Sequence, residues 1–204
     1  MPTVFYINKE TENIVSVWKI TENEDKLIKM LPYSDKIISE VKKYRNHSKK
    51  LEWLASRVLL YKYTGIIPDV KYTETGQPYI QGFNNNISIT HTAGYAAVTI
   101  SESKAGIDIE CPHERIKKIA ERFIHPEEFC FIPHDEEVNY FTLIWCAKET
   151  LFKMINKTGI IFNKELIIMP FKIENEGILK AKAFQSEYLL SYIITSDFIL
   201  VWHC

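Results

Sequence analysis

Hydrophobic and polar positions along this chain follow two periods, one typical of strands and one typical of helices. Alternation with period two predicts strands at residues 4–7, 14–20, 87–91, 95–101 and 106–110, and in the tail at 171–174, 179–184, 188–195 and 199–203. Apolar residues three and four positions apart predict two short helices on either side of Pro32, a helix at 48–63 and a longer one from about 135 to about 157. Strands and helices do not alternate regularly, which favours an α+β fold over a doubly wound α/β fold.

Residues between these segments predict how several elements begin or turn. Residues 10–13 have the composition of a hairpin turn. Asp135 is a good N-cap for the long helix. Pro112 suits the first turn of a further helix, whose apolar stripe runs from Ile116 to Phe123.

Length and charge bound the class of protein. The 204 residues suffice for one large domain or two small ones, and a boundary near residues 101–105 gives halves 1–102 and 103–204. Apolar residues make up 46% and charged residues 25%, as in an ordinary globular chain and unlike a disordered one. With 25 Lys and Arg against 26 Asp and Glu, no basic excess points to a nucleic-acid partner.

Cysteine spacing and hydropathy point to the cytoplasm. The four cysteines include no CxxC pair, so no zinc ribbon is predicted and we expect reduced thiols. The start of the sequence lacks the basic and apolar regions of a secretory signal, and no apolar run approaches about 18 residues. The sequence therefore predicts a soluble cytoplasmic protein without a membrane partner.

Two carboxylates stand two residues apart on a predicted strand. Asp108 and Glu110 face one side of it, because strand side chains alternate, while Ile107 and Ile109 face the other. A solvated acidic face is the commoner meaning of this pattern. Paired carboxylates are also the ligands that a hard cation such as Mg²⁺ prefers.

A third carboxylate interrupts the apolar stripe of the long predicted helix. The other members of that stripe are Val138, Phe141, Trp145 and Phe152. An ionised Glu149 is costly there unless it is paired or binds a metal. Lys148 and Lys153 flank the stripe, and a Glu149–Lys153 pair would stabilise the helix by only about 0.2–0.5 kcal/mol. That pair does not explain a charge on the apolar face, so Glu149 is a candidate functional residue.

Basic side chains that could meet phosphate are less distinctive. Lys50 and Arg57 lie seven residues apart and project from one helix face, although a solvated basic face is the commoner reading. His91 closes a predicted strand, and a lone histidine there is more often structural than catalytic. The histidines have no zinc-protease spacing, and the motifs GxxxxGK[ST], GxGxxG and GxSxG are absent.

Both acidic segments resemble a known family signature. Gly106-Ile-Asp108-Ile-Glu110, followed by Trp145-Cys-Ala-Lys148-Glu149-Thr-Leu-Phe-Lys153, is similar to the two-part signature of 4′-phosphopantetheinyl transferases. Weaker similarities are the strand Asn86-Ile-Ser-Ile-Thr90-His91 and the basic helix Lys49-Lys-Leu-Glu-Trp-Leu-Ala-Ser-Arg57. The length and the matches in both halves resemble the surfactin-type branch, which implies two similar α+β halves related by pseudo-twofold symmetry in one chain.

The resemblance implies a reaction and a division of roles. The phosphopantetheine arm of coenzyme A moves to a serine of an apo acyl or peptidyl carrier protein, and adenosine 3′,5′-bisphosphate leaves. Asp108, Glu110 and Glu149 would hold Mg²⁺, or Mn²⁺, on the pyrophosphate. Glu149 would help deprotonate the serine, directly or through a bound water. Lys153 would stabilise the leaving group, so Glu149, Lys153 and Asp108 are the implied catalytic residues.

The resemblance also implies residues for coenzyme A: Arg57 and Lys50 on the 3′-phosphate side of the nucleotide, Thr90 and His91 at its phosphates, and Lys148. Lys148 would bind phosphate or orient the site. The family turn Gly-Lys-Pro reads Gly76-Gln77-Pro78 here, and Gln77 can donate a hydrogen bond but carries no charge. We therefore expect weaker nucleotide binding there, or compensation by Lys71.

Carrier proteins are usually acidic around their serine, so the segment after the metal strand is the expected docking surface. Its candidates are Arg115, Ile116, Lys117, Ile119 and Phe123, although the apolar members could simply pack on the protein body. The two-half architecture implies a monomer. Two other classes stay open: a metal-dependent nucleotide or pyrophosphate hydrolase, and a catalytically silent module that binds coenzyme A.

Overall fold

The computed structural model of the chain describes residues 3–9, 13–33 and 35–203. They form two compact units, one that ends at Ser103 and one that spans Lys104–His203. Each unit combines an antiparallel sheet with helices, which confirms the predicted α+β class. Among the described residues, no helix is both long and apolar enough to cross a membrane.

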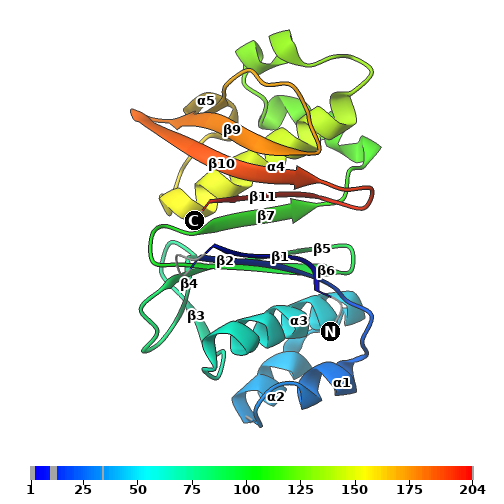
Figure 1. Cartoon of the computed structure of the whole chain (residues 1–204), viewed down its shortest axis with the longest axis vertical. Helices are drawn as coiled ribbons and strands as arrows, with labels where there is room; N and C mark the ends of the chain where they lie inside the picture. Colours follow the sequence, from blue (N-terminus) through cyan, green and yellow to red (C-terminus); the bar gives the residue numbers. More distant parts are fainter. Residues whose placement is uncertain (1–2, 10–12, 34, 204) are drawn as a thin grey trace. The chain divides into compact units, whose positions relative to one another are not determined.

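The first unit is built on a four-stranded sheet in the order β1-β2-β6-β5. Its strands are β1 (Thr3–Lys9), β2 (Asn13–Lys19), β5 (Asn86–Thr92) and β6 (Tyr95–Ser101). The helices α1 (Glu24–Lys29), α2 (Asp35–Lys43) and α3 (His47–Thr64) lie on one face of this sheet, as Figure 1 shows. A short hairpin of β3 (Val70–Tyr72) and β4 (Pro78–Ile80) completes the unit.

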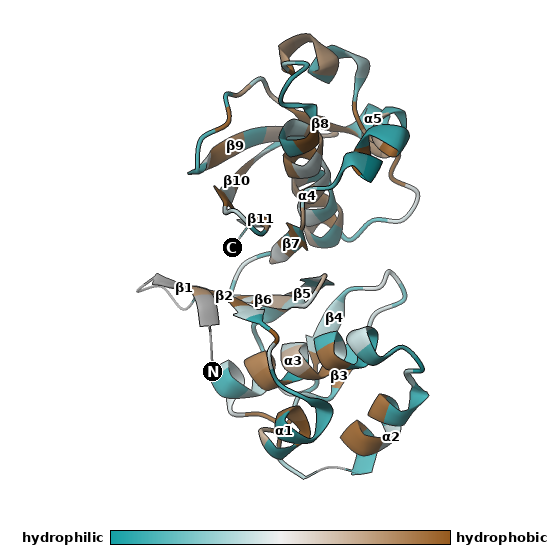
Figure 2. Ribbon diagram, turned by 90° about the vertical axis from the view of Figure 1, so that its right-hand side faces the viewer, coloured by the Kyte–Doolittle hydropathy of each residue, from teal (hydrophilic) through white to brown (hydrophobic). Residues whose placement is uncertain are grey.

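Helix α3 is the central helix of this unit, and its ends follow from local chemistry. The side chain of Asn46 accepts a hydrogen bond from the backbone N–H of Lys49 at 3.1 Å, which satisfies one donor of the first turn. Gly65 ends the helix at φ 66°, a backbone angle that favours glycine. Leu54 and Leu59 are fully buried beneath the sheet. Figure 2 shows that α1 and α2 carry both hydrophobic and hydrophilic residues, as expected of helices packed on one side.

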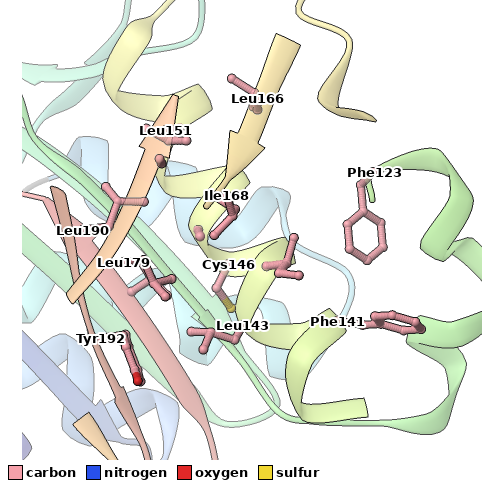
Figure 3. Close-up of a cluster of buried hydrophobic side chains, with 14 of the residues drawn as sticks. Phe123, Phe141, Leu143, Cys146, Leu151, Leu166, Ile168, Leu179, Leu190 and Tyr192 are labelled. Carbon is pink, nitrogen blue, oxygen red and sulfur yellow. The ribbon is translucent and has the colours of Figure 1, made fainter. Parts of the chain in front are cut away.

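The second unit is built on a five-stranded sheet in the order β7-β11-β10-β9-β8. Its strands are β7 (Gly106–Glu110), β8 (Leu166–Ile168), β9 (Glu176–Ala183), β10 (Ser186–Ile194) and β11 (Ile199–His203). Helix α4 (Glu137–Ile155) crosses one face of the sheet, and the 3₁₀ helices η1 (Glu114–Arg122) and η2 (Pro126–Phe131) and the short α5 (Phe162–Glu165) lie around it. Cys146 and Leu151 of α4 meet Leu179 and Leu190 of the sheet in one buried cluster (Figure 3).

Gly106 allows β7 to lie directly against α4. A Cβ atom at this position would overlap the backbone carbonyl oxygen of Thr150, far inside van der Waals contact. Only glycine therefore permits this approach. The glycine of the GID signature is thus explained by packing, and the same packing brings the residues after it next to α4.

Several predicted boundaries are wrong. The long helix starts at Glu137, and the residue before it is Glu136, which makes no side-chain cap; the predicted cap at Asp135 is therefore wrong. The helix ends at Asn156, whose φ is 53°. The segment after Pro112 is a 3₁₀ helix capped by the ring of His113, so the proline lies outside it.

Two further predictions differ in other ways. Residues 171–174 form no strand, because they lie in a loop whose Phe171 ring stacks on Tyr140 with ring centroids 5.2 Å apart. The strand at this edge of the sheet, next to β9, is β8. The predicted turn at 10–13 includes residues 10–12, which lie outside the described residues, whereas its flanking strands β1 and β2 are confirmed.

Candidate active site

Strand β7 and helix α4 bring an aspartate and a lysine into contact. The Lys153 ammonium donates to Asp108 Oδ1 at 2.7 Å and to the backbone carbonyl of Ile107 at 3.0 Å. The Asp108 side chain is only 6% exposed and that of Lys153 is 26% exposed, so one end of this pair is buried and the other reaches the surface. The two halves of the sequence signature therefore meet inside one unit.

Glu149 lies one turn before Lys153 on α4 and is half-buried. Its pKa is raised to about 7: burial is the largest cause, the Asp108 carboxylate also raises it, Lys153 lowers it and Glu110 raises it. This direction agrees with the cost that the sequence predicts for a charge on this helix face. The i, i+4 pair weighed as an alternative is not the main contact, because Lys153 binds Asp108 instead.

The helix face around Glu149 is less buried than its apolar pattern predicts. Phe141 is in the core, whereas Trp145 and Phe152 are half-buried. Their rings contact Phe162 with centroid distances of 5.7 and 5.5 Å. Glu149 thus lies on a partly open face, where desolvation perturbs a carboxylate but leaves it accessible.

The donor chemistry of this site suits a hard divalent cation. Asp108, Glu110 and Glu149 offer carboxylate oxygens, the ligands that Mg²⁺ prefers. The first two raise the pKa of the third through their charge, and a cation among them would relieve that repulsion. Among the described residues, however, no group of three or more His, Cys, Asp or Glu side chains is already arranged to hold a metal ion.

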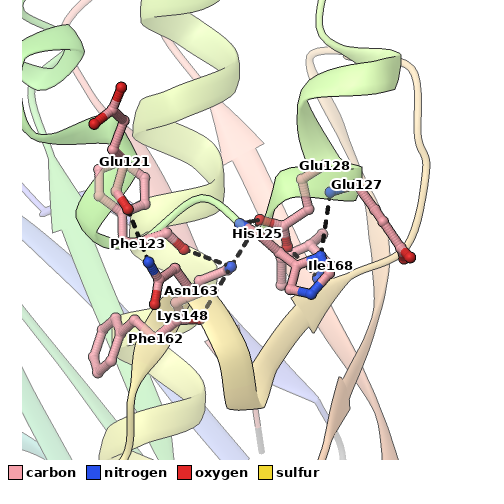
Figure 4. Close-up of polar contacts among 9 residues, drawn as sticks. All are labelled: Glu121, Phe123, His125, Glu127, Glu128, Lys148, Phe162, Asn163 and Ile168. Atoms are coloured by element: carbon pink, nitrogen blue, oxygen red, sulfur yellow. Dashed lines mark hydrogen bonds and ion pairs between the residues drawn. The ribbon is translucent and has the colours of Figure 1, made fainter.

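Lys148 occupies a different place from the one that the resemblance implies. Its side chain is fully buried, and its ammonium donates to Glu128 Oε2 at 2.7 Å and to the carbonyls of Phe123 at 2.7 Å and Phe162 at 3.3 Å (Figure 4). Three acceptors use all three protons of an ammonium. A direct phosphate contact by Lys148 is therefore wrong for this conformation, whereas the alternative, a role in orienting the site, fits.

Glu128 is the partner that the sequence analysis missed. Its Oε2 also accepts from the backbone N–H of His125 at 2.7 Å, and its Oε1 accepts from that of Ile168 at 2.6 Å. The His125 ring caps η2 while Glu128 returns a bond to the cap residue, which forms a capping box. An acidic residue three positions after a capping side chain was the available signal, but it does not reveal the buried lysine.

The predicted docking residues lie partly on a common groove. Arg115, Ile116 and Ile119 line a hollow of about 370 Å³ that also includes Glu110 and Trp145. The exposed Lys117 lies between Glu114 at 3.3 Å and Glu137 at 3.4 Å, and its hydrogen bond to Glu114 raises its pKa.

Phe123 is the exception among the predicted docking residues. It is only 1% exposed and packs edge-on against Trp145 with ring centroids 5.1 Å apart. Its position in the core is visible in Figure 3. Direct contact with a docked partner is therefore wrong for Phe123, and the alternative, packing on the protein body, holds because its ring covers α4.

In the first unit, Arg57 and Lys71 line one cavity of about 240 Å³. The Arg57 guanidinium is buried over the Trp53 ring, 4.4 Å from its centroid, and donates to Ser56 Oγ at 3.0 Å. Its Nε atom is buried and has no hydrogen-bond partner within the described part of the chain. Lys71 on β3 donates to Gln81, which directly follows β4. A stacked, incompletely satisfied cation is suited to a planar or anionic ligand.

The other predicted nucleotide residues lie elsewhere in that unit. The Lys50 ammonium pairs with Glu24 at 3.2 Å. Gln77 stands in the turn before β4, and its backbone N–H donates to Thr73 Oγ1 at 3.0 Å. Thr90 is buried on β5, and His91 beside it pairs with Glu52. Arg57 and Lys71 are thus brought together at the cavity, and the remaining candidates are not among its lining residues.

Comparison with known proteins finds similarity to one family in the second unit. Residues 104–195 match the family model of the 4′-phosphopantetheinyl transferase superfamily. The 4′-phosphopantetheinyl transferase gsp of Aneurinibacillus migulanus is 33% identical over 87 residues, which are 41% of this chain and 36% of that protein. A Haemophilus influenzae protein, provisionally named for the same activity, is 29% identical over 99 residues, or 45% of this chain and 42% of its own length.

The matched region contains both halves of the signature, and it coincides with nearly all of the second unit. The second unit of the chain is therefore similar to the 4′-phosphopantetheinyl transferase superfamily. The aligned part spans only about two fifths of the length of these curated relatives.

Proposed function

We propose that this chain transfers the 4′-phosphopantetheine arm of coenzyme A to a serine of an apo acyl or peptidyl carrier protein. The observation that carries the proposal is the contact between β7 and α4, which joins Asp108 to Lys153 and places Glu149 in the field of Asp108 and Glu110. The names of two relatives support the same activity. The protein would act in the cytoplasm as a monomer of the surfactin-type branch.

Glu149 is the proposed proton acceptor, and Lys153 is the proposed group that stabilises negative charge. A carboxyl whose pKa lies near 7 is well matched to accept a proton at neutral pH. Glu149 takes the proton of the carrier serine, whose oxygen forms a new bond to the β-phosphorus of coenzyme A. The bond from that phosphorus to the bridging oxygen breaks, and adenosine 3′,5′-bisphosphate leaves. Lys153 stabilises the charge that develops on the leaving phosphate.

Asp108, Glu110 and Glu149 are the proposed magnesium ligands, with manganese as an alternative ion. When bound, the ion would neutralise charge on the pyrophosphate. Lys153 holds Asp108 from the side of α4. This contact keeps the buried aspartate in one orientation, so Lys153 would serve the metal ligands as well as the leaving group.

The cavity lined by Arg57 and Lys71 is the proposed site of the nucleotide end of coenzyme A. A purine can stack on aromatic side chains such as Trp53, and a phosphate suits the guanidinium. Lys50, Gln77, Thr90 and His91 are the other proposed contacts. Since Gln77 replaces a charged residue of the family turn, we expect Gln77→Lys to lower the KM for coenzyme A; an unchanged or higher KM would contradict its role.

The groove between Glu110 and Trp145 is the proposed docking surface for the carrier. Ile116 and Ile119 supply its apolar part, and Arg115 supplies exposed positive charge that suits an acidic partner. Lys117 would add charge when a partner competes with Glu114 and Glu137 for its ammonium.

Intact-protein mass spectrometry tests the proposed function. The purified protein is mixed with coenzyme A, Mg²⁺ and a panel of apo acyl and peptidyl carrier proteins. The matched control for each carrier replaces its acceptor serine by alanine, and a second control replaces Mg²⁺ by a chelator. We expect one carrier or more to gain the mass of one phosphopantetheine, with no gain in either control.

Other outcomes favour the competing classes. Consumption of coenzyme A without a gain on any carrier would favour a hydrolase. Intact coenzyme A and unmodified carriers, together with tight binding of coenzyme A, would favour a silent binding module and contradict the transferase.

A further inference from the structure

A buried glutamate on α3 contacts the histidine at the end of β5. Oε2 of Glu52 lies 3.1 Å from Nδ1 of His91, and the side chains are 6% and 37% exposed, respectively. The other carboxylate oxygen, Oε1, accepts a hydrogen bond from Ser48 Oγ at 3.1 Å. Glu52 therefore connects one turn of α3 to β5 within the first unit.

This arrangement has a physical reason. A carboxylate removed from water is costly unless its oxygens have donors. Ser48, one helical turn earlier, satisfies one oxygen, and the His91 ring lies at the other. Since an ionised carboxylate only accepts hydrogen bonds, the ring nitrogen that faces it carries a proton. The contact with Glu52 thus favours a proton on Nδ1 of His91.

The outer side of the ring is determined at the same time. Nδ1 faces the buried Glu52, and the His91 side chain as a whole is 37% exposed, so we assign the ligand-facing role to Nε2. A carboxylate at Nδ1 also stabilises the imidazolium form, in which Nε2 carries a proton as well. An imidazolium donates a charge-assisted hydrogen bond to a phosphate oxygen, whereas the Nδ1–H tautomer of a neutral ring presents a lone pair there.

We propose that Glu52 is a positioning residue, which holds His91 by Nδ1 so that Nε2 donates to a phosphate of coenzyme A. The role of His91 as a phosphate contact rests on the proposed function. Glu52 acts only through His91 and does not touch the ligand. Glu52 belongs to the basic segment from Lys49 to Arg57, where the sequence pattern alone predicts no role for it.

Nitrogen-15 NMR of the ligand-free protein tests the geometry without reference to activity. We expect the His91 Nδ1 signal of the wild type to be that of a protonated nitrogen at neutral pH, and the Nε2 signal to become that of a protonated nitrogen once coenzyme A is added. In Glu52→Gln the amide can either accept from Nδ1 or donate to it, so the Nδ1 protonation falls. Glu102→Gln, at an exposed position of the same unit, is the matched control and leaves the His91 signals unchanged.

Calorimetric titration with coenzyme A tests the consequence. We expect Glu52→Gln to weaken binding roughly tenfold, because a hydrogen bond to a charged group contributes about 1.5 kcal/mol or more. His91→Ala weakens it at least as much. In the double variant, Glu52→Gln adds nothing to the loss in His91→Ala, because Glu52 acts through that ring. A merely structural role would give additive losses.

Three results would overturn the inference. One is an unprotonated Nδ1 in the wild type, the second is wild-type affinity for coenzyme A in Glu52→Gln, and the third is a further loss in the double variant. A folded wild type that binds no coenzyme A overturns the proposed function itself, and with it the ligand-directed role of Glu52, even when the expected tautomer is observed.

Discussion

The position of Glu149 lowers the stability of the folded protein when its carboxyl is ionised, and it gives this carboxyl an unusually high pKa. Its carboxyl lies on a half-buried helix face in the field of two other carboxylates, so its charged form is disfavoured. The same two causes suit Glu149 to the proposed roles of a base at neutral pH and a ligand for a cation. Active-site residues often combine perturbed pKa values with such unfavourable surroundings.

The pH dependence of unfolding tests this cost. The pKa of Glu149 is about 7 in the folded protein against a usual 4.5, so the folded state binds the extra proton between those values. Stability from this group therefore falls as pH rises from about 4.5 to about 7. Glu149→Gln removes that slope, and in a chelator above pH 7 it raises the free energy of unfolding by at most about 3 kcal/mol.

Urea unfolding of wild type and Glu149→Gln at several pH values between 4.5 and 8 measures the difference. Added Mg²⁺ should then stabilise the wild type more than the variant, because the ion binds the folded state. Parallel pH profiles for the two proteins would show that the carboxyl is not perturbed.

Gly106 gives a prediction about packing. In Gly106→Ala the new methyl group overlaps the carbonyl oxygen of Thr150, and neither backbone can yield without moving β7 from α4. We expect a loss of about 1–3 kcal/mol, as for other overpacked sites, and a loss of transfer activity as Asp108 shifts. Gly82→Ala, where a Cβ meets nothing within 4 Å but φ is positive, separates clash from backbone strain. Wild-type activity in Gly106→Ala would contradict the packing account.

At the scale of elements, the buried Lys148 holds four segments together. Its ammonium joins α4 to the end of η1, to Glu128 in η2 and to the start of α5 (Figure 4). Because Lys148 precedes Glu149 in the helix, the same turn of α4 that anchors these segments presents the candidate base. The signature lysine thus contributes order beside the site.

Removing one partner of this pair is more damaging than removing both. Glu128→Gln leaves an unpaired buried ammonium, so we expect a loss of about 3 kcal/mol or more in the free energy of unfolding. The double variant Glu128→Leu/Lys148→Met replaces both charges by apolar groups and recovers part of that loss. Glu187→Gln, which alters an exposed pair with Lys182, is the control and changes stability by less than about 0.5 kcal/mol. A double variant less stable than Glu128→Gln would contradict this interpretation.

The elements show what the sequence could predict. Periodicity located α3, α4 and most strands, because each buries one side against a layer of its own unit. It failed at residues 171–174, where an aromatic residue packs in a loop, and at the 3₁₀ helix η1, whose apolar spacing resembles that of an α-helix. The spacing of apolar residues indicates which side of a segment is buried, but it does not indicate whether the backbone is an α-helix, a 3₁₀ helix or a loop.

At the scale of the whole molecule, the sequence predicted the α+β class and the residues of the candidate site more readily than their partners. Asp108, Glu149 and Lys153 belong to a short signature, so they could be named in advance. Glu128 and Glu52 could not be named in advance. The partner of Glu128 is Lys148, 20 residues away, and the partner of Glu52 is His91, which lies in another element. Long-range pairs of this kind depend on the fold and not on spacing.

The central claim is that the carboxylates of β7 and α4 carry phosphopantetheine transfer. Single-turnover transfer to a carrier protein, measured for wild type and Glu149→Gln at saturating coenzyme A, tests it most directly. Since the substitution Glu149→Gln keeps the shape of the side chain but removes its basic oxygen, we predict a rate lower by a factor of about 10²–10⁴ with the fold retained. A rate within about a factor of two of the wild-type rate would contradict the claim, because other proton acceptors in the site could not supply that much of the rate.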